Sequence, residues 1–134
     1  MPVTIPLFAA IFALLAAATH IYIFLLESLW WMRPTTRKTF GIRTEEAAAT
    51  LRPMAYNQGF YNLFLALGVL FGWLLTLAEN PVLSQTGIGM ALLALASMFG
   101  AALVLVLHNG KMLRAALVQG VAPAIALLLL FVPG

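Results

Sequence analysis

The sequence predicts an all-α membrane protein, a bundle of four transmembrane helices with a short interfacial helix between helices one and two. Hydrophobic residues make up 63% of the 134 residues and charged residues only 8%, against about 25% charged in soluble domains. Four apolar stretches each reach the roughly 20 residues that cross a bilayer. No stretch shows the alternation typical of membrane barrel strands, so helices are the expected spanning elements.

This composition excludes several classes of protein. Seven basic and four acidic residues cannot cover the surface of a soluble domain of this length. The net charge of +3 follows from where a few basic residues sit, so we expect no nucleic-acid partner. Cysteine is absent, which excludes a disulfide framework, a zinc knuckle and a thiol nucleophile.

We expect one domain, residues 1–134, that contains the four spans in order. The spans run from about Leu7 to Trp31, from about Ala55 to Ala78, from about Gly87 to Leu107 and from about Leu113 to Val132. The first span has no basic residue before its apolar run and closes with Glu27 and a tryptophan pair. These features indicate a retained helix and not a signal peptide.

The segment between the first two spans carries its own helix signals. Pro34 stops the first span from continuing. Thr44 is followed by two glutamates, which together are typical of a helix start. We therefore expect a short interfacial helix from Thr44 to Leu51, ended by Arg52 and Pro53.

The basic residues predict the orientation. Five lie between spans one and two, and two lie between spans three and four: Arg33, Arg37, Lys38, Arg43, Arg52, Lys111 and Arg114. The N-terminus and the loop from Glu79 to Thr86, with its Asn80–Pro81 turn signal, carry none. Because short basic loops stay in the cytoplasm, both termini should face outward from a bacterial inner membrane.

Polar side chains gather in the predicted cytoplasmic half of the bundle. His20 and Glu27 are seven residues apart in the first span, so they share a helix face at about 10 Å separation along the axis. Amides and a tyrosine open the second span, and another amide lies at similar depth in the fourth. We expect catalytic roles for His20 and Glu27, and substrate-binding roles in one interior pocket for Asn57, Gln58, Tyr61, Asn62 and Gln119.

Each of these residues also has a structural interpretation. Amides inside spans often only bond neighbouring helices, at roughly 0.6 kcal/mol per pair, and tyrosines often belong to an aromatic belt. His108 is better explained as a solvated loop residue. A buried Glu27 is harder to explain structurally, because a buried charge is costly. The GxxxG pattern of Gly68 and Gly72 indicates close helix packing or self-association.

Three segments resemble a known family: His20 to Glu27, Asn57 to Asn62, and Gln119 to Ala124. On these residues the chain resembles the small bacterial four-helix membrane family called domain of unknown function thirteen-oh-four. The resemblance covers nearly the whole chain, and its most specific part is Asn57 to Asn62. It implies four transmembrane helices, a short cytoplasmic loop and no established reaction. Around His108 the chain departs from the family's glycine-rich segment, so no role follows for that histidine.

The polar set favours an intramembrane enzyme that performs acid–base chemistry on a lipophilic small molecule. A carboxyl group in apolar surroundings favours its neutral form, so Glu27 could donate a proton as well as accept one, with His20 as partner across a substrate or water. Amides would orient a carbonyl, epoxide or hydroxyl, which suits isomerisation, epimerisation or cyclisation. We expect no cofactor and no metal, and the GxGxxG, GxSxG and HExxH motifs are absent.

Three alternatives stay open. A proton-coupled transporter is one, because four helices with one embedded glutamate are similar in layout to small multidrug exporters. Its site would normally lie near the midplane of a repeated structure, and homodimerisation could supply the missing repeat. A second alternative is cofactor binding, in which His20 and His108 would bind haem or, together with Glu27, a metal ion. The two histidines are expected at different depths in the membrane, which argues against one haem between them. A purely structural membrane subunit is the third.

Overall fold

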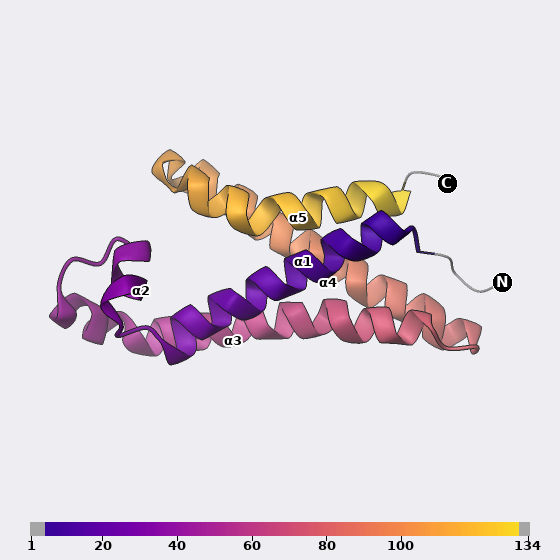
Figure 1. The fold of residues 1–134 in the computed structure, drawn as a ribbon, viewed down its shortest axis with the longest axis horizontal. Helices are drawn as coiled ribbons and strands as arrows, with labels where there is room; N and C mark the ends of the chain where they lie inside the picture. The colour runs from indigo at the N-terminus through magenta and orange to yellow at the C-terminus, as the bar shows by residue number, and fades with distance from the viewer. Residues whose placement is uncertain (1–4, 132–134) are drawn as a thin grey trace. The chain divides into compact units, whose positions relative to one another are not determined.

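The computed structural model of the chain describes residues 5–131, which form helices joined by short turns (Figure 1). In order these are α1 (Leu7–Phe24), a π-helical turn (Leu25–Leu29), α2 (Pro34–Thr39), α3 (Glu45–Thr76), α4 (Pro81–His108), a 3-10 turn (Gly110–Met112) and α5 (Leu113–Phe131).

The predicted all-α fold with four spanning helices is confirmed. Within residues 5–131, four helical segments are long and apolar enough to cross a membrane: Leu7–Leu29, Glu45–Thr76, Pro81–His108 and Gly110–Phe131. Val132, the predicted end of the fourth span, lies outside the described residues.

The short helix between the first two spans lies earlier in the chain than predicted. It is α2, and its first turn contains Pro34, where the missing N–H would have had no partner in any case. The prediction that Thr44 to Leu51 forms a separate helix is wrong, because α3 begins at Glu45 and continues through Pro53. Proline at position 53 removes one backbone hydrogen bond, but the helix continues past it to Thr76.

Two local signals were interpreted correctly. Thr44 caps α3, since its Oγ1 accepts a hydrogen bond from the backbone N–H of Ala47 at 3.1 Å. Asn80 caps α4 in the same way, accepting from the N–H of Val82 at 2.9 Å, and Pro81 follows in the first turn. Both caps satisfy backbone donors that have no partner inside the helix.

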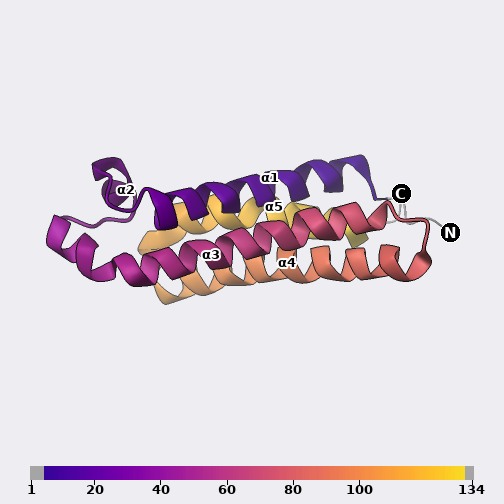
Figure 2. The same cartoon turned by 90° about the horizontal axis from the view of Figure 1, so that it is seen from below.

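The chain divides into two compact units. The first contains the chain up to Thr19 and from Leu65 onward, and the second is His20–Phe64. In the first unit, α4 and α5 form an antiparallel pair joined by the 3-10 turn (Figures 1 and 2). The second unit contains the end of α1, the π-helical turn, α2 and the first part of α3.

Helices of the first unit pack through small side chains. The buried residues of α4 and α5 recur mostly every three or four positions and are mainly Ala and Gly: Ser84, Gly87, Ala91, Ala94, Leu95, Met98, Ala102, Ala116, Gly120, Pro123 and Ala126. Large apolar side chains such as Leu93 and Val104 point outward instead. Lipid gives helices little hydrophobic reason to associate, so close van der Waals contact through small residues takes its place.

The GxxxG pattern is used for packing inside the chain. A Cβ atom on Gly72 would lie 2.7 Å from the carbonyl oxygen of Gly87 and 2.8 Å from the backbone nitrogen of Ala91. One turn earlier, a Cβ atom on Gly68 would lie 3.2 Å from that of Ala94. Close contact between α3 and α4 therefore explains the pattern, and self-association stays a prediction.

We expect Gly72→Ala to lower the free energy of unfolding by about 1–3 kcal/mol, because the added methyl group forces two backbones apart. Loss of helical circular dichroism during titration of mixed micelles with dodecyl sulfate measures this change. The control is Gly89→Ala in α4, where an added Cβ atom meets nothing within 4 Å. An equal loss in both variants would contradict the packing explanation.

Candidate functional site

The end of the first span departs from α-helical geometry around Glu27. The backbone N–H of Trp30 donates to the carbonyl of Leu25, five residues back, at 2.8 Å, and Leu25–Leu29 forms one π-helical turn. Such turns are frequent at functional sites. The wider π-helical turn rotates Glu27 around the helix axis relative to its place in a regular α-helix. The seven-residue spacing from His20 to Glu27 therefore does not by itself put the two side chains on one face of the helix.

A hydrogen bond joins Glu27 to the second span. The Nδ2 atom of Asn62 donates to Oε2 of Glu27 at 2.9 Å and to the backbone carbonyl of Gln58 at 3.1 Å. Both hydrogens of this amide are thereby used, which fixes its orientation toward the carboxyl group. Within residues 5–131, Asn62 is the residue whose side chain bonds the Glu27 carboxyl group.

The close approach of the two helices beside this bond requires Gly59. A Cβ atom there would overlap the hydroxyl of Ser28 and lie 3.1 Å from Cβ of Glu27. The Ser28 hydroxyl donates to the backbone carbonyl of Tyr56 at 2.8 Å. Sequence reasoning missed Ser28 and Gly59. A signal for Gly59 was available, because it precedes Asn62 by three residues and so shares its helix face.

A second connection holds the loop end of this unit. The Nε1 atom of Trp31 donates to the backbone carbonyl of Ala48 at 2.8 Å, and the indole is buried. Its ring packs against Phe40, with 5.2 Å between ring centroids. The buried indole N–H therefore has the partner that such a group normally requires, and it attaches the first turns of α3 to the end of the first span.

Aromatic side chains line one side of α3 near the carboxyl group. Phe60 meets Phe24 edge to face at 5.1 Å between centroids, and it also contacts Tyr56 at 5.1 Å and Phe64 at 6.2 Å. Tyr56 and Phe64 are about half exposed or more. These rings provide apolar surroundings for the segment that carries Gly59 and Asn62.

Of the seven predicted site residues, the structure brings Glu27 and Asn62 together. His20 is buried in the same unit, with 2% of its surface exposed, and Gln58 contributes its backbone carbonyl while its side chain is exposed. Gln119 is half-buried in α5, in the other unit.

Asn57 and Tyr61 do not point into an interior pocket as predicted. Both side chains are exposed. Each is two residues from Gly59, which puts it on the opposite side of the helix from the packed face. Equal depth along the helix was a poor guide, because depth does not specify direction around the axis.

A small cavity among the spanning helices of the first unit holds none of the predicted site residues. It measures about 20 Å³, lies in the first unit, and is lined by apolar side chains that include Ala13, Trp73 and Leu95. Across the described residues, no three His, Cys, Asp or Glu side chains gather closely enough to hold a metal ion. The candidate site is therefore the hydrogen-bonded pair of Glu27 and Asn62, which joins two spanning helices.

The fold and this pair define a four-helix integral membrane protein whose first two spans are joined by a hydrogen-bonded glutamate. A family model described as protein of unknown function (DUF1304) matches residues 14–131. The chain belongs to this family, as its resemblance in sequence predicted. No curated protein and no solved structure matches the chain.

We expect Gly59→Ala to lower the free energy of unfolding by about 1–3 kcal/mol, because the methyl group overlaps the Ser28 hydroxyl. Ser28→Ala alone should cost about 1 kcal/mol through its lost hydrogen bond. The double variant should lose less than the sum of the two, with a coupling of at least about 0.5 kcal/mol. The measurement is unfolding by dodecyl sulfate in mixed micelles.

The matched control for this cycle is Gly100→Ala, where an added Cβ atom also meets nothing within 4 Å. Paired with Ser28→Ala, it should give additive losses. Additive losses for Gly59→Ala and Ser28→Ala as well would show that these two residues are not in the contact described.

Proposed function

We propose that the protein is an intramembrane acid–base enzyme, of the isomerase, epimerase or cyclase type, that acts on a lipophilic small molecule. The observation that carries this proposal is the hydrogen bond from Asn62 to Glu27 between spanning helices. A carboxyl group in a span is costly and in most cases serves a function. A carboxyl group held in a fixed orientation can donate a proton to a bound molecule and accept one from it.

The hydrogen bond gives the carboxyl group a direction. Oε2 of Glu27 accepts from Asn62, so the acidic proton resides on Oε1, and that oxygen is the one that meets the substrate. After the proton has left, the same amide N–H stabilises the carboxylate. In this proposal His20 is the second proton carrier, reached through the substrate or a water molecule.

The exposed polar residues of α3 suit a substrate that arrives from the bilayer. Asn57, Gln58 and Tyr61 are exposed on α3, at the polar start of the predicted second span. In the proposal the side chain of Gln58, one helical turn from Asn62, receives the polar end of the molecule, a carbonyl, epoxide or hydroxyl. A lipid-soluble substrate would then reach the carboxyl group sideways, without crossing an aqueous channel.

The reaction class predicts a signature that requires no knowledge of the substrate. Isomerisation or epimerisation at carbon forms a C–H bond with a hydrogen that has exchanged with solvent, so wild-type protein in vesicles of bacterial lipid extract in heavy water should introduce non-exchangeable deuterium into one lipid-soluble component. Cyclisation through a hydroxyl group moves only protons on oxygen and leaves no such label. Mass spectrometry detects the label. Glu27→Gln cannot transfer a proton and should lower the rate by about 100-fold or more.

The control is Glu46→Gln, which removes an exposed carboxyl group in the first turn of α3 and should leave deuterium uptake unchanged. Uptake by Glu27→Gln at the wild-type rate would reject the proposed role of Glu27, and no uptake by the wild type would reject isomerisation and epimerisation. Proton flux across the vesicle membrane that depends on Glu27, without deuterium uptake, would favour the proton-coupled transporter instead.

We further propose a bacterial inner-membrane location with both termini outside the cytoplasm. The support is the distribution of basic residues, which lie in the α2 region, near the start of α3 and around the start of α5, and are absent from the turn between α3 and α4. The turn between α3 and α4 would then face outward.

Cysteine labelling of intact cells tests this orientation, since the natural chain has no cysteine. Thr35 and Glu79 are both exposed and lie in opposite connections. A membrane-impermeant maleimide should label Glu79→Cys and not Thr35→Cys, whereas both should be labelled after permeabilisation. The reverse pattern in intact cells would overturn the orientation.

A further inference from the structure

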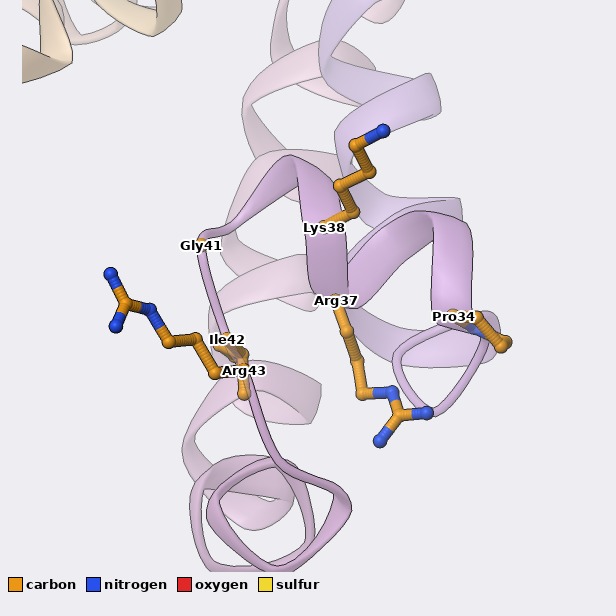
Figure 3. Close-up of a pocket in the computed structure, with 6 residues that line it drawn as sticks. All are labelled: Pro34, Arg37, Lys38, Gly41, Ile42 and Arg43. Atoms are coloured by element: carbon orange, nitrogen blue, oxygen red, sulfur yellow. The ribbon is translucent and has the colours of Figure 1, made fainter.

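A basic cleft lies in the second unit between α2 and the chain that leads to α3 (Figure 3). It measures about 490 Å³ and is lined by Pro34, Arg37, Lys38, Gly41, Ile42 and Arg43. Three of these six residues are cationic and none is acidic. The proposed acid–base chemistry at Glu27 makes no use of this cleft.

A well-defined turn shapes the cleft. Gly41 has a φ of 70°, a conformation that glycine adopts without strain. Its N–H donates to the carbonyl of Lys38 at 3.2 Å, and the N–H of Ile42 donates to the carbonyl of Arg37 at 2.8 Å. This pair of bonds is a Schellman motif. It ends α2 and turns the chain so that Arg43 flanks the residues of α2.

Arg37 has donor capacity that the protein does not use. Its Nε atom is buried and has no hydrogen-bond partner within residues 5–131, although buried polar groups are normally bonded. Its Nη1 atom is 4.0 Å from Oε2 of Glu45, whose side chain is 79% exposed. An ion pair that long and that exposed contributes little, so the guanidinium is suited to bind an anionic ligand.

The position of the cleft indicates which anion is available. Pro34 follows the end of the first span, Leu29, by five residues. Between them the guanidinium of Arg33 lies over the ring of Trp30, 4.6 Å from its centroid. Tryptophan and arginine at the end of a span are typical of the membrane interface. The cleft therefore belongs at the depth of the lipid headgroups.

We propose that this cleft binds the phosphate group of an anionic phospholipid, with Arg37 as the central donor. The guanidinium fork matches two phosphate oxygens. Figure 3 shows Lys38 and Arg43 extending away from Arg37 in different directions. The three cations thus cover a width of surface, which suits a layer of headgroups better than one small free anion.

Native mass spectrometry of the full chain in detergent micelles tests the proposal, with phosphatidylglycerol and phosphatidylcholine as probes. The anionic lipid should bind several-fold more tightly. Arg37→Gln should weaken phosphatidylglycerol binding about fivefold or more, since each basic residue at an anionic surface contributes about 1 kcal/mol. Arg43→Gln changes an exposed side chain, and it should weaken binding at least about twofold.

The matched control is Arg114→Gln, which removes the same charge from an exposed position in α5 and should leave the affinity within about 1.5-fold of wild type. Equal loss in this control would assign binding to net charge, and wild-type affinity in both Arg37→Gln and Arg43→Gln would exclude the cleft. Displacement of phosphatidylglycerol by inorganic phosphate at equal concentration would assign the cleft to a free anion. Each of these three results overturns the proposal.

Discussion

The architecture depends on the constraint that lipid gives two apolar helices no hydrophobic reason to associate. Van der Waals contact between the helices then has to hold them together, and it becomes stronger as their backbones come closer. The chain meets this constraint mainly with alanine and glycine where α4 and α5 pack, and a Cβ atom on Gly120 would lie only 2.6 Å from that of Ala102. Many of its large apolar side chains, such as Leu93 and Val104, face outward. This division is the reverse of a soluble core, in which large side chains are inside.

The same constraint explains how a carboxyl group is accommodated. A polar side chain between spans needs a hydrogen-bond partner on the neighbouring helix. Gly59 lets the two helices come close enough for this, because its missing side chain leaves room for that of Ser28. The close packing at Gly59 and the hydrogen bond from Asn62 to Glu27 therefore depend on each other. A bulkier residue at 59 would separate Asn62 from Glu27 without changing either of them.

Local and compositional signals were readable from the sequence, and features that depend on distant contacts were not. Apolar length predicted the spans, the side-chain oxygen of Thr44 predicted a helix start, and Asn80 with Pro81 predicted a turn. The end predicted at Pro53 was wrong because the rule for residues before proline is a preference, and α3 continues past it. Glu27 and Asn62 were both expected in the site, but their pairing follows from a π-helical turn that spacing rules for an α-helix do not anticipate.

The unbroken course of α3 has a consequence for membranes of different thickness. Its 32 residues span roughly 48 Å, well beyond a hydrocarbon core of about 30 Å. A thicker or thinner bilayer would therefore move the boundary between lipid and water along α3. Bilayer thickness would then set how much of the segment from Asn57 to Asn62 is wetted, while the hydrogen bonds within that segment stay the same.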